Sequence, residues 1–303
     1  MDKPTLSINK EDLLNIGNTL GKTEFLTCLV ESNLFNITYH NYTISTFHGQ
    51  FAATVFYNDK KIYIDWWEYP APTYSYEVYN ANFDLIIKLQ DVNLTNEQFE
   101  KNCCRKRTLA DLLPEQRLTF WKKIVPWTFF CSRMMKQFVN KEDQIEKLPI
   151  ERLAFFCGKS WKARNGMLKK IQSDGIECVF SSQETAGMIP LTDQEYIHKM
   201  KTSKYGLVLH GRASHLTEAK NRREIDYMML TKPLLLNYKP YYYNPLIAGK
   251  HYIYIDENTD LKLIDKQYNI EEIASNGYEW YKNNASKEGV TKTFLQIVKE
   301  KIT

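Results

Sequence analysis

The second half of the chain alternates short apolar runs with amphipathic segments. The runs LAFFC (153–157), IECVF (176–180) and YGLVLH (205–210) have the length and near-continuous hydrophobicity of buried strands. Between the last two runs, Thr192 and Glu195 have the spacing of a capping box, which marks the start of a helix. Strands and helices that alternate through short connections predict a parallel sheet with helices on both faces. We therefore expect a doubly wound α/β fold in this half.

The same alternation continues toward the C-terminus. A helix centred on REIDYMML leads into PLLL (233–236), and HYIYID (251–256) has the pattern of one more strand. In the last helix, Val290, Phe294 and Ile297 belong to one apolar stripe. The stripe predicts that this helix docks on another part of the protein.

The first half follows a less regular pattern. Alternating runs such as ATVFY, KIYIDWW, YSYEVY and FDLIIKL, all within residues 45–90, predict strands, whereas residues 110–150 have a helical pattern. The polar stretch NKEDQIEKLP separates this half from the regular second half, so we place a domain boundary there. Two domains, residues 1–148 and 149–303, agree with a length of 303 residues, which exceeds the usual range of a single core.

Composition and charge exclude several functions. The 40 Lys and Arg residues against 36 Asp and Glu residues leave a charge of +4, which is too small and too scattered to indicate a nucleic-acid partner. The six cysteines form no C-x-x-C pair and none stands at zinc-ligand spacing with a histidine, so we expect reduced thiols and no metal. The N-terminus has no apolar signal core, and no apolar stretch approaches the ~18 residues of a membrane span. We therefore expect a cytoplasmic protein without a transmembrane segment.

Two strands of the second half are each followed by a glycine and by cations. In a parallel α/β sheet, ligands bind at the carboxyl ends of the strands, where helix N-termini attract anions. A glycine permits close backbone approach, and Lys or Arg neutralises a phosphate. Two neighbouring strand ends of this kind predict a diphosphate site that needs no metal. Its residues are Gly158, Lys159, Ser160 and Arg164 after the first strand, and Gly211 and Arg212 after the third.

A third candidate segment is NRREIDYMML. Arg222 and Arg223 stand at the expected start of a helix, with Glu224 and Asp226 in its first turn. A carboxylate there can accept hydrogen bonds from both hydroxyls of a ribose, while an arginine reaches phosphate. The alternative is that the acids only complement the helix dipole and that the arginines are solvated.

The first half offers candidates for a general base. The strand KIYIDWWEYPAP ends with Asp65 and Glu68, and Asp84 in FDLIIKL is a weaker candidate. Carboxylates beside aromatic rings suit sugar binding, because the apolar faces of a sugar stack on rings while its hydroxyls need acceptors. The alternative is that the rings are core and that both acids face water. The aromatic neighbours are Trp66, Trp67, Tyr69 and Tyr74.

Three segments of the second half resemble a known family. GKSWKARNGML, KYGLVLHGR and RREIDYMMLTKPLLL, the last followed by YYNPLIAGKHYI, are similar to the donor half of GT-B glycosyltransferases. They are most similar to the capsule-associated and protein O-glucosyl- and xylosyltransferase-like families and to related enzymes of large DNA viruses. The resemblance covers roughly half of the chain. It implies two Rossmann-like domains facing a cleft: an acceptor-binding domain at 1–148 and a nucleotide-sugar-binding domain at 149–303, whose last helix, about 288–303, packs back on the first domain.

The resemblance also implies roles for residues of the donor site. Arg164 would bind the diphosphate of the nucleotide-sugar, for which UDP-sugars are favoured, and Arg212 or Arg223 would assist it. Glu224 or Asp226 would hold the ribose. The sequence departs from the family pattern in having two consecutive arginines and no Ser-Phe-Arg string, so the choice among the arginines stays open.

The expected reaction is transfer of a sugar to a hydroxyl of a glycan or glycoprotein acceptor. Similar families carry an Asp shortly before a Pro, which favours Asp65 over Glu68 as the base of an inverting displacement. No DxD motif stands at a strand end, so we expect a metal-independent enzyme without a cofactor other than its nucleotide-sugar substrate. A non-catalytic protein that binds a nucleotide or a glycan is the alternative.

Two further motifs are excluded as sites. GNTLGKT (17–23) resembles a phosphate-binding loop, but three residues instead of four separate its first glycine from the Gly-Lys pair. His210 and His215 lie near Glu218, yet their spacing does not suit one helical face, so we expect no metal there.

Overall fold

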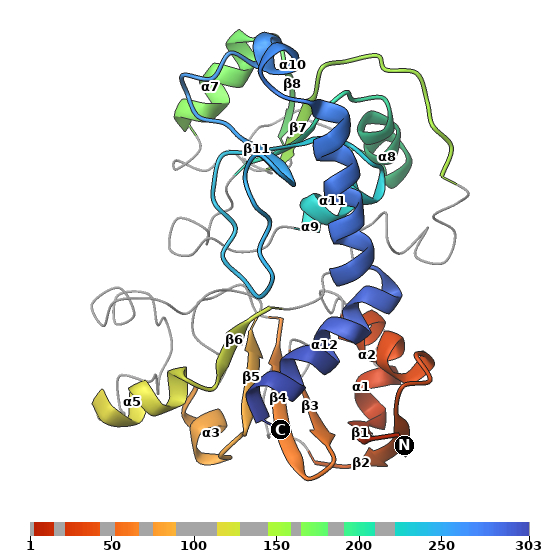
Figure 1. Ribbon diagram of the computed structural model, residues 1–303, viewed down its shortest axis with the longest axis vertical. Coiled ribbons are helices and arrows are strands. Elements are labelled where there is room, and N and C mark those ends of the chain that lie inside the picture. Colours follow the sequence, from red (N-terminus) through yellow and green to blue (C-terminus); the bar gives the residue numbers. More distant parts are fainter. Residues whose placement is uncertain are drawn as a thin grey trace.

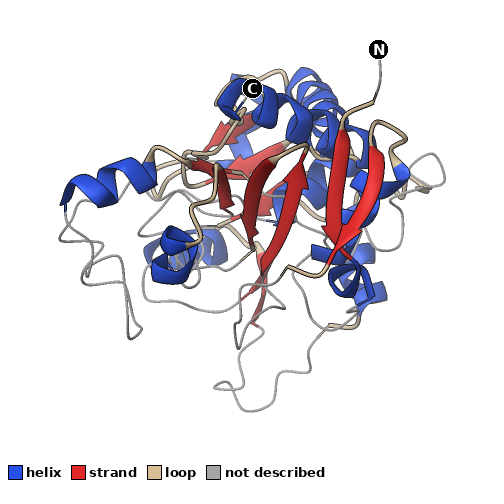
Figure 2. Cartoon of the chain, turned by 90° about the horizontal axis from the view of Figure 1, so that it is seen from below, coloured by secondary structure: helices blue, strands red, loops and turns tan. Residues whose placement is uncertain are grey.

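The computed structural model describes residues 3–14, 22–42, 52–66, 75–88, 114–127, 145–158, 165–180, 191–209 and 222–302. Strands and helices alternate along these ranges, which confirms the α/β class. Figure 2 shows the strands in the middle of the molecule with helices around them. Among the described helices, none combines the length and the apolar character that a membrane crossing requires.

The first half forms one six-stranded sheet in the order β2-β1-β3-β4-β5-β6. Strand β3 runs antiparallel to β1 and β4, and the other neighbouring strands are parallel. Three of the alternating runs, ATVFY, KIYIDWW and FDLIIKL, supply β3, β4 and β5 as expected. The strands are β1 (Thr5–Asn9), β2 (Asn36–His40), β3 (Ala52–Tyr57), β4 (Lys60–Asp65), β5 (Leu85–Lys88) and β6 (Ile124–Pro126).

The described residues of this half include four helices; one expectation about this part of the chain is wrong, and one is confirmed only in part. YSYEVY, expected as a strand, lies mostly in α3 (Ser75–Asn80), because six alternating residues are too few to distinguish the period of a strand from that of a helix. Of residues 110–150, expected as helical, Pro114–Trp121 form helix α5 as expected, whereas Ile124–Pro126 form strand β6, a short apolar run paired with β5. The other two helices are α1 (Lys10–Leu14) and α2 (Lys22–Glu31).

The turn between β3 and β4 shows why the antiparallel strand lies in a mostly parallel sheet. Tyr57 and Lys60 pair across the ladder, which leaves Asn58 and Asp59 as a two-residue loop. Asn58 has a φ of 50°, a left-handed conformation that asparagine adopts more readily than most residues. Its side-chain oxygen accepts a hydrogen bond from the backbone N–H of Thr5 at 3.0 Å, which ties the turn to β1.

In the described ranges of the second half there are five strands, and their pairings are parallel. They form a two-stranded sheet β7-β8 and a three-stranded sheet β11-β10-β9. Backbone hydrogen bonds from Lys204 to Arg152 and from Tyr205 to Leu153, both of 2.9 Å, join the two sheets just before β7 and β9 begin. The strands are β7 (Phe155–Gly158), β8 (Glu177–Phe180), β9 (Gly206–Val208), β10 (Leu234–Leu236) and β11 (Tyr252–Tyr254).

These hydrogen bonds give the spatial order β8-β7-β9-β10-β11. After β7, the chain adds β8 on one side and then β9, β10 and β11 on the other, so the strand order reverses between β7 and β9. In open α/β sheets, such a reversal opens a crevice at the carboxyl ends of the two strands. The expected capping box of Thr192 and Glu195 is confirmed at the start of α8. The helices of this half are α7 (Asn165–Ser173), α8 (Asp193–Lys201), α9 (Arg222–Met229), α10 (Ile264–Gln267) with the short η6 (Leu261–Leu263) before it, α11 (Ile270–Asn284) and α12 (Lys287–Ile302).

Helix α12 crosses from the second half of the chain to the first sheet (Figure 1). The ring of Phe294 is fully buried and lies 5.8 Å from the ring of Phe25 on α2. The hydroxyl of Thr291 donates to the carbonyl of Cys28 at 3.3 Å, and Lys287 forms an ion pair with Glu31 at 2.6 Å. The apolar stripe of the last helix is therefore buried against α2.

A segment that we call the linking loop, residues 237–251, also joins the two halves. It leaves the carboxyl end of β10 and returns to β11. The backbone N–H of Tyr243 donates to the carbonyl of Pro126, the last residue of β6, at 2.9 Å, and its hydroxyl bonds to Glu300 of α12 at 2.7 Å. The indole N–H of Trp280 on α11 donates to the carbonyl of Asn244 at 3.0 Å. The loop thus brings the carboxyl edges of the two halves toward each other (Figure 1).

Replacing Phe294 with alanine tests the docking of α12. We expect Phe294→Ala to lower the free energy of unfolding by about 3–5 kcal/mol, because it leaves a cavity in the core. Chemical denaturation followed by tryptophan fluorescence measures the change. Lys292→Ala is the matched control, since Lys292 lies on the same helix in an exposed pair with Glu288, and should change stability by less than about 0.5 kcal/mol. A similar loss in both variants would contradict a specific role for the buried ring.

His251 predicts a dependence of stability on pH. Its Nδ1 accepts a hydrogen bond from the backbone N–H of Ile247 at 3.0 Å, and burial lowers its pKa from 6.5 to about 4, with a smaller contribution from Lys250. The folded protein then binds fewer protons than the unfolded chain, so stability should fall as the pH drops through this interval. His251→Asn keeps an acceptor for Ile247 and removes the titration, so urea unfolding should show a shallower decline. The exposed His198 serves as the control: if His198→Asn flattens the decline equally, the assignment to His251 is wrong.

Candidate functional site

The carboxyl edge of the first sheet carries a buried ion pair. Asp65 ends β4, Lys88 ends β5, and the two residues face each other in the parallel ladder. Lys88 Nζ lies 3.5 Å from Asp65 Oδ1, and both side chains are 0% exposed. Taking two charges out of water is costly, and only their attraction and additional hydrogen bonds offset that cost. The pair therefore fixes the position of the Asp65 carboxylate and gives it a counter-charge.

Asp65 thus lies at the sheet edge where α/β proteins bind ligands, but away from solvent. A general base must come within hydrogen-bond reach of the proton that it takes, and the full burial of Asp65 beside Lys88 leaves no such approach in this structure. Trp66 is also fully buried, with its ring edge-on to Phe25 at 5.5 Å between centroids. Its ring belongs to the core and offers no face to a sugar.

The structure places neither of the other two acids suggested as general bases at this carboxyl edge of the first sheet. Asp84 precedes β5 at the opposite edge of the sheet, where its carboxylate lies 3.8 Å from Lys60 and accepts the backbone N–H of Lys61 at 2.8 Å. Glu68 lies outside the described residues, as do Trp67, Tyr69 and Tyr74.

A second ion pair stands at the same edge. Lys22, the first residue of α2, places Nζ 2.8 Å from Oδ1 of Asp12 on α1. The ammonium also lies 3.5 Å from the carbonyl oxygen of Ala52, which pairs with Asp65 across β3 and β4. The side chain of Lys22 is 1% exposed and that of Asp12 is 19% exposed. Burial raises the pKa of Asp12, and Lys22 partly opposes the shift. Of these two neighbouring pairs, Asp12 is the member that reaches solvent.

Sequence reasoning missed Asp12, Lys22 and Lys88, although two signals were present. Lys88 ends the otherwise apolar run FDLIIKL, and a charge at the end of a buried strand calls for a counter-charge. Lys22 belongs to GNTLGKT, which does not match a phosphate-binding loop, and its ammonium contacts a carboxylate instead. Residues 17–21 of that motif lie outside the described residues.

The second candidate edge is the carboxyl edge of the strands in the second half, at β7 and β9, where the strand order reverses. Gly158 is the last residue of β7 and is buried. The segments that continue from β7 and β9 carry the other residues of the expected diphosphate site. These residues, namely Lys159, Ser160, Arg164, Gly211 and Arg212, lie outside the described part of the chain. The structure therefore describes the neighbouring strands β7 and β9, from which these two segments continue.

Arg223 lies at the start of α9. Its guanidinium donates a hydrogen bond to the hydroxyl of Tyr196 on α8 and lies close to Cys157, the residue before Gly158. Burial opposes the charge of Arg223, but Tyr196, Cys157 and Tyr227 outweigh it and raise the pKa of the guanidinium. The structure thus places Arg223 near β7, the strand that ends at Gly158.

Glu224 and Asp226 face the interior. Glu224 is 0% exposed and accepts hydrogen bonds from the hydroxyls of Tyr238 and Tyr242, the latter at 3.3 Å. Burial raises the pKa of both tyrosines well above the ordinary value, and Glu224 adds to the shift. Asp226 is 2% exposed. Ribose binding by these acids stays a prediction, and their burial argues against it.

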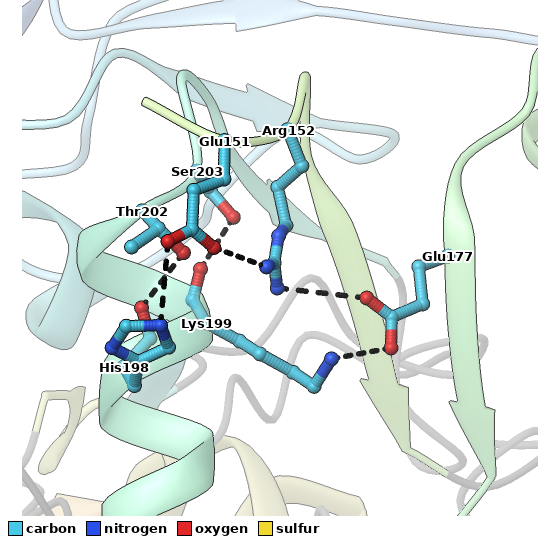
Figure 3. A network of polar contacts seen from close by, with 7 residues as sticks. All are labelled: Glu151, Arg152, Glu177, His198, Lys199, Thr202 and Ser203. Atoms are coloured by element: carbon cyan, nitrogen blue, oxygen red, sulfur yellow. Dashed lines mark hydrogen bonds and ion pairs between the residues drawn. The ribbon is translucent and has the colours of Figure 1, made fainter. Parts of the chain in front are cut away.

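The opposite edge of the second half carries a separate polar network (Figure 3). Arg152, just before β7, lies 2.7 Å from Glu151 and 3.5 Å from Glu177 at the start of β8, and Glu177 also pairs with Lys199 of α8. These charges compensate one another at the amino ends of the strands. The network therefore fastens α8 to the sheet and is not a candidate site. Its members are Glu151, Arg152, Glu177, His198, Lys199, Thr202 and Ser203.

Comparisons add no identification. No model of a known protein family matches this chain, and no curated protein sequence matches it. Within the described ranges, no three His, Cys, Asp or Glu side chains are placed to hold a metal ion. His210 and His215 fall outside those ranges. The function must therefore be argued from the two facing edges.

The buried pair at β4 and β5 predicts an asymmetry between single and double variants. Asp65→Asn should lower the free energy of unfolding by about 3–5 kcal/mol, because it leaves the Lys88 ammonium buried without its counter-charge. The double variant Asp65→Asn, Lys88→Met removes both charges and should recover most of that loss. Urea denaturation measures both. Lys60→Met, which breaks the exposed pair with Asp84, should cost less than about 1 kcal/mol. Equal losses in the single and double variants would contradict the role of the pair.

Proposed function

We propose that this protein is a glycosyltransferase that moves a sugar from a nucleotide-sugar, a UDP-sugar by preference, to a hydroxyl of a glycan or glycoprotein. The observation that carries the proposal is the arrangement of the two carboxyl edges, which the linking loop brings toward each other through Tyr243 and Pro126. Ligands of α/β sheets bind at such edges. Two of them facing each other suit a reaction that joins a donor to an acceptor, as in the GT-B architecture that the resemblance implies.

The second edge is assigned to the donor. Arg223 lies near β7, and the segments that contain Arg164 and Arg212 continue from β7 and β9. Guanidinium groups form bidentate, charge-assisted hydrogen bonds with phosphate, and Gly158 permits close approach of the backbone. Lys159 and Ser160 would add an ammonium and a hydroxyl. In this proposal, Glu224 supports the donor site through the linking loop that it holds.

The first edge is assigned to the acceptor. In an inverting displacement, a carboxylate takes the proton of the acceptor hydroxyl as its oxygen attacks the anomeric carbon. The bond from that carbon to the diphosphate breaks, and the electron pair leaves with the diphosphate, whose charge the arginines offset. Asp65 is the base that the resemblance implies. Of the two described ion pairs at this edge, Asp12 is the acid that reaches solvent, so both acids are tested.

Paired neutralisation separates a catalytic acid from a structural one. We compare Asp65→Asn, Lys88→Met with Asp12→Asn, Lys22→Met, because each double variant leaves neither charge of its ion pair unmatched. Loss of the base should lower kcat by about 100- to 10,000-fold while the variant stays folded and binds UDP. The assay measures UDP- and GDP-sugar hydrolysis and transfer to simple glycosides. Lys60→Met is the control and should retain full activity.

The rival function is non-catalytic binding of a nucleotide or glycan, which the sealed Asp65–Lys88 pair favours. Binding of UDP raises the melting temperature in either case. Binding without turnover of any donor, with or without acceptor, would establish the rival and exclude the transferase. Full activity in both double variants would leave the transferase standing and remove both acids from the role of base.

A further inference from the structure

A cavity of about 300 Å³ opens at the amino ends of β5 and β6, between α3 and α5. It lies at the edge of the first sheet opposite the carboxyl edge that carries Asp65. Cavities of this size stand at the lower end of the range for small-molecule sites. A ligand that fills it therefore has a single ring, and the site is separate from the proposed reaction.

Aromatic rings and polar groups share the lining. The rings come from Tyr79, Phe83 and Phe120, with Tyr79 and Phe120 edge-on at 6.1 Å between centroids. The side-chain amides of Asn80 and Asn82 add paired donors and acceptors. Rings beside amides suit a molecule with one apolar face and several hydroxyl groups, which is the chemistry of a sugar.

The polar side of the cavity is already fixed in place. Asn82 adopts a φ of 48°, and its backbone N–H donates to the carbonyl of Tyr79 at 3.0 Å, which closes the turn after α3. Lys123 Nζ donates to Asn82 Oδ1 at 2.9 Å, and Lys61 Nζ donates to the carbonyl of Ala81 at 3.0 Å. A site held in this way loses little conformational entropy when it binds a ligand.

The charge of the cavity is positive. Lys123 is its one charged lining residue, and no carboxylate belongs to the lining among the described residues. The nearby Asp84 is directed to Lys60 and to the backbone of Lys61. An ammonium that bonds only to an amide oxygen within the described structure keeps donors for an anionic group, and such charge-assisted bonds are the stronger ones.

We propose that this cavity binds an acidic monosaccharide unit, a pyranose ring whose carboxylate meets Lys123 while its hydroxyls meet Asn80 and Asn82. The inference does not rest on glycosyl transfer, because binding is measured without a donor. In a glycan-modifying enzyme, such a site would hold an acidic residue of the acceptor away from the reacting end. The cavity is then a second, non-catalytic anchoring site.

The experiment titrates the full chain with sodium glucuronate, glucose and inorganic phosphate, using isothermal titration calorimetry and saturation-transfer NMR. Glucuronate should bind at least tenfold more tightly than glucose or phosphate. Lys123→Met should weaken glucuronate binding at least tenfold, since it removes a charge-assisted contact. Lys122→Met is the matched control, because Lys122 is exposed and does not line the cavity.

Asn82→Asp keeps the proposal testable if Lys123→Met is poorly folded. Aspartate tolerates the left-handed backbone of position 82 and can still accept from Lys123, yet its charge should abolish glucuronate binding. Equal binding of glucose and glucuronate, binding of phosphate alone, or no binding of any probe would overturn the proposal. So would unchanged glucuronate binding in Asn82→Asp. Each of these results leaves the transferase proposal untouched, because that is judged by donor turnover.

Discussion

The relative position of the two sheet edges depends on a buried carboxylate. A carboxylate without contact to water needs hydrogen-bond donors to replace its hydration, and Glu224 obtains them from the hydroxyls of Tyr238 and Tyr242. Both tyrosines belong to the linking loop, so satisfying Glu224 draws the start of that loop onto α9. From there the loop reaches Pro126 of β6 and Glu300 of α12 through Tyr243. One electrostatic requirement on α9 thereby helps to set where the first sheet lies.

The charges of the two edges are organised differently. At the first edge, Lys88 pairs with Asp65 and Lys22 pairs with Asp12, so these four described charges balance one another. At the second edge, Arg223 has phenol and thiol neighbours beside the end of β7. A polyanionic donor is drawn to an edge with an excess of positive charge, whereas an uncharged hydroxyl has no such preference. In the proposed transferase, the donor would therefore meet the arginines of the second edge, and the acceptor hydroxyl would meet the first.

The sequence allowed the second half to be predicted better than the first, for a physical reason. Parallel strands that are buried on both faces appear as continuous apolar runs, and the Thr192–Glu195 capping box is a local signal. The first half mixes parallel strands with an antiparallel one, and its three-residue strand Ile124–Pro126 lies in a segment that also contains a helix, so no single period describes that segment. Tertiary pairing with β5 decides the conformation of the strand.

The candidate site was harder to predict because burial is not a local property. An acid that ends a strand, such as Asp65, has the same sequence signature whether it faces a substrate or a lysine on the next strand. Glu224 looks like an acid that complements a helix dipole, and its true partners follow 14 and 18 residues later. The sequence around Asp226 has the same pattern, an acid in the first turns of a helix, and does not reveal that Asp226 is buried. The sequence predicts the strands and therefore the edge of the sheet. The partner of each charged residue is known only once the chain is folded.

Burial therefore separates the charges that hold this protein together from those that can meet a ligand. Asp65, Lys88 and Glu224 are 0% exposed and have partners within the protein. Asp12 and Lys123 keep some exposure; within the described residues, Asp12 accepts from Lys22 and Lys123 donates to Asn82. A partly exposed group can exchange a proton or bind an anion directly, whereas a fully buried group first needs a local opening of the structure. Chemistry at the first edge is thus more readily explained by Asp12 than by Asp65, unless ligand binding opens the Asp65–Lys88 pair.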